Sequence, residues 1–155
     1  MIKHIKCDIF ESGADVILHQ VNCQGVMGSG VAKQVKEKYP NIYESYQLMC
    51  DRNTNRANLL GLAQCVPIEH GKFIVNLFAQ ENFGYDGTCY TDYDALKMCL
   101  IGVRDYPMFD DKTIAIPYLM GCHRGGGDWN IVYKMIEDIF ANSECKVLIC
   151  EYNGG

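Results

Sequence analysis

The chain has 155 residues, of which 48% are hydrophobic and 21% charged, and its formal net charge at pH 7 is −5. We expect one domain over residues 1–155, because this length and composition suit a single substantial core. The negative charge argues against a general nucleic-acid binder, which would carry a basic surface. No apolar run approaches about 18 residues and the first residues lack a signal-peptide core, so we expect no membrane contact and a cytoplasmic location.

Nine cysteines are scattered along the sequence, and no two of them form a Cys-x-x-Cys pair. This odd number and irregular spacing favour free thiols in a reducing compartment over a disulfide framework. The four histidines are equally dispersed. The sequence therefore predicts no metal site, and we expect no cofactor.

Apolar periodicity predicts strands and helices in the order β, β, α, α, β, β, α, β, α, β. In the first half, strands are expected at 2–7 and 16–21, and a helix at 31–38 is expected to end before Pro40. Asn41 is then the expected cap of a second helix that runs to about residue 50.

In the second half, 61–68 and 72–78 read as a hairpin, and Thr91 is the expected cap of the next helix. A short buried strand at 113–116, a helix after residue 130 and a last strand at 146–150 complete the pattern. The sequence therefore predicts an α/β fold with a mixed sheet and helices on its faces.

Two of the strand-to-helix connections are rich in glycine, at 22–30 and at 121–127. A glycine-rich loop that opens a helix directs free backbone N–H groups and the positive end of the helix dipole at a ligand, which suits a phosphate. For one loop alone, a flexible connection is an equal alternative. Two such loops meeting at the carboxyl ends of strands favour a pyrophosphate site.

Several segments, taken together and in order, resemble the macro domain, an α/β/α module that binds ADP-ribose. They are Asp8-Ile9, Val21-Asn22-Cys23-Gln24-Gly25-Val26-Met27-Gly28-Ser29-Gly30-Val31-Ala32, Tyr90-Thr91, and Gly121-Cys122 through Gly126-Gly127-Asp128-Trp129. The likeness covers essentially the whole chain and is closest to the branch of the terminal ADP-ribose protein glycohydrolase and the yeast ADP-ribose 1''-phosphate phosphatase. It implies a three-layer α/β/α fold with a mixed central sheet.

The resemblance also implies roles for individual residues. Asp8 and the backbone of Ile9 would contact the adenine, against which Tyr152 would pack, and Asn22 would contact the distal ribose. Without the resemblance, Asp8 and Asn22 read as turn residues and Tyr152 as hydrophobic cover. The first phosphate loop would be Gly28, Ser29, Gly30 and Val31, and the second Gly121, Cys122, His123, Arg124, Gly125 and Gly126. Gly126 is expected to face the pyrophosphate.

The chain departs from the glycohydrolase branch at two positions. Where that branch has a lysine after the hairpin, this chain has Gln80 or its neighbour Glu81, and Gly125 replaces an aspartate. None of these residues supplies an amine for a Schiff base or a lysyl adduct. His123 stands where many relatives have glycine, and is either a proton donor or a residue that caps the loop.

The expected function is therefore binding of ADP-ribose with hydrolysis of a 1''-substituent, either a 1''-phosphate or an ester-linked ADP-ribose, without a catalytic lysine. Asn22 and His123 are the candidate catalytic residues, and Asn82 and Asp86 are further candidates on the neighbouring loop. The alternative is a non-catalytic reader of ADP-ribose or of terminal ADP-ribosyl groups. A binder of other nucleotides or of poly-ADP-ribose is a third hypothesis.

Overall fold

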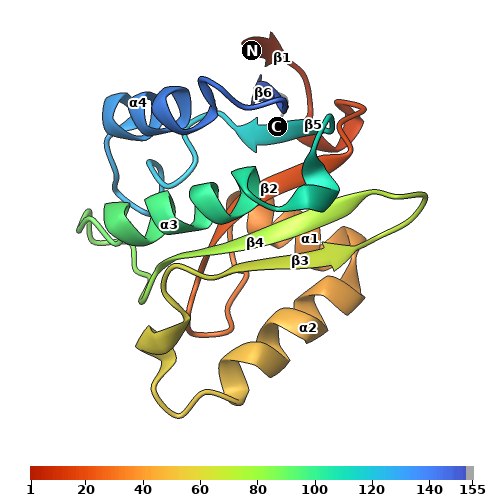
Figure 1. Ribbon diagram of the computed structural model, residues 1–155. Coiled ribbons are helices and arrows are strands. Elements are labelled where there is room, and N and C mark those ends of the chain that lie inside the picture. The colour runs from red at the N-terminus through yellow and green to blue at the C-terminus, as the bar shows by residue number, and fades with distance from the viewer. Residues whose placement is uncertain (153–155) are drawn as a thin grey trace.

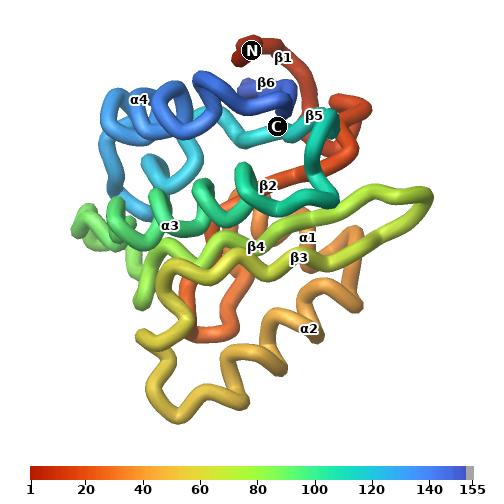
Figure 2. Tube along the Cα trace, in the orientation of Figure 1, coloured from red at the N-terminus to blue at the C-terminus, as the bar shows by residue number. Residues whose placement is uncertain are grey.

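A computed structural model describes residues 1–152, which form a six-stranded sheet with helices on both faces (Figures 1 and 2). The strand order is β1-β6-β5-β2-β4-β3, and all neighbours are parallel except the antiparallel β3–β4 pair. The strands are β1 (Ile2–Lys6), β2 (Val16–Asn22), β3 (Ala63–Pro67), β4 (Phe73–Gln80), β5 (Thr113–Pro117) and β6 (Lys146–Glu151). The helices are α1 (Gly30–Lys38), α2 (Pro40–Asp51), α3 (Tyr93–Arg104) and α4 (Trp129–Phe140). The predicted three-layer fold with a mixed sheet is confirmed.

Two predicted helix starts are wrong. Pro40 is the first residue of α2, with Tyr39 before it as the cap, so Asn41 lies inside the helix. Proline fits this position because the first helical N–H has no intrahelical partner. Asp92, whose side chain accepts a hydrogen bond from Ala95 N at 3.0 Å, caps α3 in place of Thr91.

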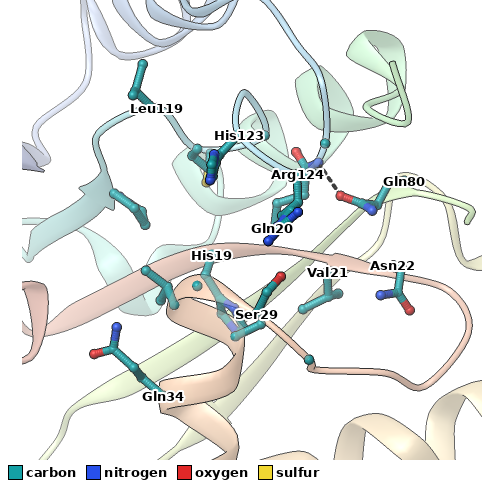
Figure 3. Close-up of a pocket in the computed structure, with 18 of the residues that line it drawn as sticks. His19, Gln20, Val21, Asn22, Ser29, Gln34, Gln80, Leu119, His123 and Arg124 are labelled. Carbon is teal, nitrogen blue, oxygen red and sulfur yellow. Dashed lines mark hydrogen bonds between the residues drawn. The ribbon is translucent and has the colours of Figure 1, made fainter. Parts of the chain in front are cut away.

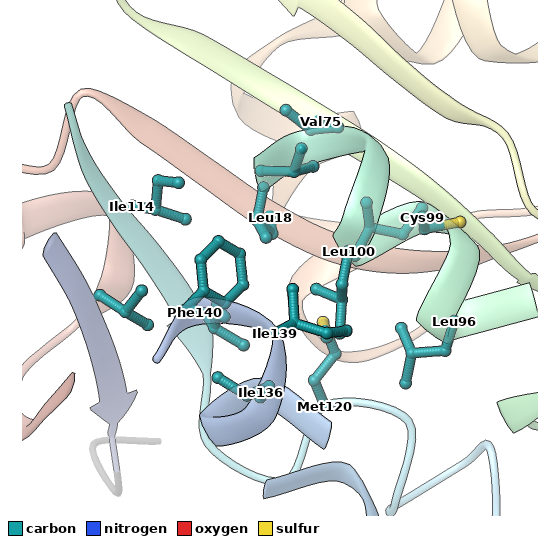
Figure 4. Close-up of a cluster of buried hydrophobic side chains, with 14 of the residues drawn as sticks. Leu18, Val75, Leu96, Cys99, Leu100, Ile114, Met120, Ile136, Ile139 and Phe140 are labelled. Carbon is teal, nitrogen blue, oxygen red and sulfur yellow. The ribbon is translucent and has the colours of Figure 1, made fainter. Parts of the chain in front are cut away.

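Two apolar layers sandwich the sheet, because successive strand residues point to opposite faces. Leu18 of β2 packs with Leu100 of α3 and Phe140 of α4 on one face (Figure 4). On the other face, the neighbouring Ile17 packs in the layer that contains Tyr46 of α2. Within residues 1–152, no helix combines the length and the apolar character needed to cross a bilayer.

A register shift between Val21 and Asn22 makes the pairing of β2 with β4 skip Ala79, so that Asn22 lies opposite Gln80. Such irregularities re-aim side chains at the ends of strands. Here the shift sets two polar residues opposite each other at the point where both strands leave the sheet.

Candidate functional site

A cleft of about 530 Å³ lies at the carboxyl ends of the parallel strands. Its walls come from the segments that follow β1, β2, β4, β5 and β6, so most of its lining residues are far apart in the sequence. This is the edge of an open α/β sheet at which ligands bind, and the volume is in the range of small-molecule sites. The lining includes most of the predicted site residues: Asp8, Ile9, Asn22, Gly28, Ser29, Gly30, Val31, Gly121, His123, Arg124, Gly125 and Tyr152.

The first glycine loop opens α1 into this cleft. Ser29 is the cap residue, but its side chain makes no capping hydrogen bond. Gly30 has a φ of +59°, and a Cβ on it would meet open space. The first N–H groups of a helix have no intrahelical partner and carry partial positive charge. The start of α1 therefore presents N–H groups that suit an anion in the cleft.

Asn22 is held rigidly at the end of β2. Its Oδ1 accepts hydrogen bonds from Gln24 N at 2.9 Å and from the Tyr46 hydroxyl at 2.8 Å, while its Nδ2 donates to Val26 O at 2.8 Å. The residue is 8% exposed. Because the amide oxygen is engaged, Asn22 can offer a ligand its second N–H and act as a donor only.

At the opposite end of the cleft, Asp8 follows β1. Its Oδ1 accepts a hydrogen bond from Phe10 N at 3.0 Å and so caps a short 3₁₀ turn, Ile9–Glu11. Its other carboxylate oxygen makes no hydrogen bond with the described residues. Tyr152, just past β6, lines the same end and is 57% exposed. An acceptor beside an exposed aromatic ring suits a planar base that carries an amino group.

The second glycine loop is built differently from the prediction. The carboxylate of Asp128 caps α4 by accepting from Asn130 N at 2.9 Å, and neither residue lines the cleft. The positive end of α4 is thus satisfied within the chain. Gly126 also lies outside the cleft, and a Cβ on it would stand 2.5 Å from Thr88 O. The expectation that Gly126 faces a pyrophosphate is wrong, because its bare side faces the backbone of the neighbouring loop.

Hydrogen bonds tie this second loop to the segment before α3. The N–H groups of Tyr90 and Thr91 donate to Gly125 O at 2.7 and 2.9 Å. The Thr91 hydroxyl donates to Gly121 O at 2.7 Å, and a Cβ on Gly125 would lie 2.5 Å from that hydroxyl. Gly125 and Gly126 therefore allow this loop to pack closely against the segment before α3. Cys122, which was also predicted to contact the ligand, does not line the cleft.

His123 and Arg124 form the rim of the cleft, above β2 in Figure 3. His123 is exposed and makes no hydrogen bond with the described residues. It can therefore turn toward a ligand.

Gln80 occupies the wall where related glycohydrolases are expected to have a lysine. Its Oε1 accepts from Gln20 Nε2 at 2.8 Å (Figure 3), and its Nε2 donates to Asn82 O at 2.9 Å. Both ends of the amide are thus engaged. Glu81, Asn82 and Asp86 do not line the cleft. Asp86 instead accepts from Thr88 N and from the Tyr90 hydroxyl, so it shapes its own loop.

A cysteine nucleophile does not fit the cleft either. Cys150 is its only cysteine, and burial raises the pKa of the Cys150 thiol to about 12. Burial also raises the pKa of the Cys122 thiol, to about 11. Both are neutral thiols near pH 7. Within residues 1–152, no three His, Cys, Asp or Glu side chains are grouped so as to hold a metal ion.

Sequence reasoning missed several lining residues, above all the adjacent His19 and Gln20 on β2. The signal was present, because two polar residues interrupt the apolar strand 16–21. Phe83 and Tyr85, on the loop after β4, were also missed. Nothing in their local pattern marks them, since the loop is folded against a segment about forty residues later in the sequence, the one that carries Arg124.

A scan of protein-family models finds no match to this chain. Among solved structures, the macrodomain of Mycobacterium tuberculosis DarG superposes with a TM-score of 0.76 at 25% identity, over 97% of each chain. The macrodomain of Thermus aquaticus DarG has the same fold, with a TM-score of 0.79 at 23% identity over 99% of each chain.

Curated relatives give a consistent result. The DNA ADP-ribosyl glycohydrolase of Mycobacterium tuberculosis is 25% identical over 141 residues, which are 90% of this chain and 39% of that protein. The chain thus spans about two fifths of the length of this relative. The ADP-ribose 1''-phosphate phosphatase of Scheffersomyces stipitis is 35% identical over 74 residues, or 43% of each protein. The resemblance drawn from the loops is confirmed, and the chain has the fold of these macrodomains.

Proposed function

We propose that this chain binds ADP-ribose in the cleft and hydrolyses a substituent at the distal 1'' position, either a phosphate or an ester-linked group. The observation that carries the proposal is the uncapped start of α1, which opens into the cleft between Asp8 at one end and Asn22 and His123 at the other. Helix starts of this kind bind phosphate. The names of the two curated relatives point to the same ligand class.

The strand order supports an elongated ligand. Asp8 follows β1 and Gln80 ends β4, and these two strands are separated by β6, β5 and β2. Four inter-strand steps of about 4.8 Å span about 19 Å. This length accommodates a base near Asp8, a diphosphate near the start of α1 and a second ribose near Asn22.

The chemistry that we propose uses water as the nucleophile, because Gln80 supplies no amine and Cys150 is a neutral thiol. The second N–H of Asn22 would orient the distal ribose or its 1''-phosphate, whose own oxygens would hold the water. Water attacks the phosphorus, the bond from phosphorus to the ribose 1''-oxygen breaks, and His123 protonates the leaving oxygen. This assignment makes Asn22 a positioning donor and His123 the general acid.

Titration calorimetry with ADP-ribose, ADP and AMP tests the binding, and preference for ADP-ribose is expected. Phosphate release from ADP-ribose 1''-phosphate, together with ADP-ribose release from ester-linked protein and from ADP-ribosylated single-stranded DNA, tests the hydrolysis. Tight binding without turnover of any of these substrates would make the protein a reader of ADP-ribose. Binding of ADP and AMP as tightly as ADP-ribose would contradict the proposal itself.

The remaining inferences concern the whole chain. A single domain over residues 1–155 is supported by one continuous sheet that includes the first and last strands. A cytoplasmic location is supported by nine cysteines that are all free, as is usual in reducing compartments. Fractionation of the native host with a thiol-alkylation assay on the isolated protein would test the location.

A further inference from the structure

Two buried side-chain atoms among the described residues have no hydrogen-bond partner, and both belong to the lining of the cleft. They are His19 Nδ1 and Gln20 Oε1, on consecutive residues of β2. Consecutive strand residues point to opposite faces. In Figure 3, Gln20 lies above β2 with Arg124, whereas the His19 side chain extends below it, on the side of Ser29 and Gln34. His19 is 1% exposed.

The other ring nitrogen of His19 starts a chain of hydrogen bonds that ends on the backbone. His19 Nε2 lies 2.6 Å from Asn76 Oδ1, Asn76 Nδ2 donates to Gln64 Oε1 at 3.0 Å, and Gln64 Nε2 donates to Ser45 O at 3.2 Å. A backbone carbonyl can only accept. This end therefore fixes the direction of every bond in the chain.

The direction of the chain determines the tautomer of His19. Because Asn76 presents its oxygen to the ring, Nε2 must carry a proton and donate it. Burial lowers the pKa of His19 to about 4, so the ring is neutral near pH 7. A neutral imidazole that is protonated on Nε2 has a bare Nδ1, which is an acceptor.

Because His19 Nδ1 is an acceptor, only a hydrogen-bond donor can lie against it favourably. A diphosphate at the start of α1 has only acceptor oxygens near neutral pH, and these would repel a bare nitrogen. An O–H group is the complementary partner, either a hydroxyl of the ligand or a water that bridges to the ligand. An unpartnered buried polar atom is otherwise unfavourable, and such atoms are rare in folded proteins.

We propose that His19 is a ligand-binding residue, whose unprotonated Nδ1 accepts a hydrogen bond from an O–H group in the occupied cleft. The network from Asn76 to Ser45 then acts through His19, by holding the ring in the tautomer that leaves this nitrogen free. This inference rests on the proposed function, since it takes ADP-ribose as the occupant.

A matched pair of substitutions separates this role from a merely structural one. The amide group of asparagine can place an oxygen near the position of Nδ1, whereas glutamine places its nitrogen near the position of Nε2. His19→Asn therefore keeps the acceptor and loses the bond to Asn76, and His19→Gln does the reverse. We expect His19→Gln to bind ADP-ribose about fivefold to tenfold more weakly than the wild type, and His19→Asn to stay within about threefold. A structural role predicts the opposite order, because only glutamine preserves the network.

Titration with ADP distinguishes the two sources of the O–H group. If His19→Gln loses affinity for ADP-ribose but not for ADP, the donor belongs to the distal ribose. If it loses affinity equally for both ligands, the donor is a bridging water or the proximal ribose. His70→Asn, at an exposed turn outside the cleft, is the control and should bind like the wild type.

Nitrogen NMR of the histidine rings in the unmutated protein tests the tautomer without any variant. We expect His19 to be protonated on Nε2 in the free protein near pH 7, with a change in its Nδ1 resonance when ADP-ribose is added. A proton on Nδ1, or wild-type affinity in a folded His19→Gln, would overturn the inference while leaving the proposed function intact. If the wild type does not bind ADP-ribose, the proposed function fails instead, whatever the tautomer.

Discussion

The guanidinium of Arg124 lies 4.2 Å above the ring of Tyr85, so side chains from the loops after β5 and β4 meet at the rim of the cleft. Tyr85 is 66% exposed. A cation–π contact at an exposed site contributes only about 0.5–1 kcal/mol. Farther from the rim, the same two loops are held together by backbone hydrogen bonds, which the N–H groups of Tyr90 and Thr91 donate to Gly125 O. The rim contact can therefore break to admit a ligand while the loops stay in place below it.

Two glycine substitutions should have opposite effects on binding and on stability. The Cβ of Gly28→Val would meet only Val26, at an ordinary 3.6 Å, and Gly28 lines the cleft. We expect this variant to keep nearly the wild-type free energy of unfolding and to weaken ADP-ribose binding at least about tenfold, because the side chain occupies ligand space. Gly126→Val should instead destabilise the fold by about 1–3 kcal/mol, since its φ is +69° and its Cβ would meet Thr88 O. Urea unfolding and calorimetry check both, and a Gly28→Val that binds normally would place the phosphate elsewhere.

Adenine selectivity should depend on Asp8. Asp8→Ala is expected to weaken ADP-ribose binding by about 1.5–3 kcal/mol, because the adenine amino group loses a charged acceptor. Asp8→Asn should lose less, since its amide oxygen still accepts and still caps the turn at Phe10. The inosine analogue of ADP-ribose, which lacks the amino group, provides the control. The wild type should discriminate against it and Asp8→Ala should not. Equal affinities of the wild type for the two ligands would remove Asp8 from the base site.

The burial of His19 should make stability depend on pH. Because its folded pKa of about 4 lies below the ordinary value of 6.5, the unfolded chain binds more protons between these values. Stability should therefore fall as the pH falls from about 6.5 to 4, by up to about 3 kcal/mol from this group. Urea unfolding at a series of pH values measures this dependence. The free energy of unfolding of His19→Gln should lack this fall, and that of the exposed His70→Asn control should retain it. Parallel slopes in the wild type and His19→Gln would mean that the ring is accessible to protons in the folded state.

His123 is the proposed general acid, so His123→Ala should lower kcat about 10²–10⁴-fold. The dissociation constant of ADP-ribose should change little, because the residue is at the rim and bonds to no other described residue. Phosphate release and calorimetry on the same preparation measure the two quantities. Normal turnover in the variant would reduce His123 to a loop residue.

No covalent intermediate is expected, because the lining of the cleft contains no lysine. Intact mass spectrometry after incubation with ADP-ribose and borohydride should show the unmodified wild-type mass. Gln80→Lys puts an amine on the cleft wall and serves as the control for trapping. An ADP-ribose adduct that maps to a residue of the wild-type cleft would contradict the proposal that water is the nucleophile.

Much of the fold could be predicted because its signals are local. The apolar run of β2 and the helical spacing of α4 each follow from burial of one short segment. Pro40 was misread because proline both ends one helix and begins the next, and only the turn at Tyr39 decides between the two.

The candidate site was less predictable where it depends on partners that are distant in the sequence. A run of glycines shows where side chains are absent, but it does not show what lies next to each glycine. Beside Gly126 lies the backbone of Thr88, more than thirty residues earlier in the sequence. In the same way, Gln80 was recognised as a departure from the family, but its engagement by Gln20 follows from the pairing of β2 with β4.

The first strand of the chain completes the sheet by pairing with the last, so that Ile5 lies beside Cys150. A contact between segments so far apart closes a long loop of chain, and such contacts form late and slowly. During synthesis, β1 cannot join the sheet until β6 has been made, because β6 is the strand with which it pairs. The Asp8 end of the cleft is thus assembled after the end that carries Asn22, and a nascent chain can form the glycine loop before α1 earlier than it completes the proposed base site.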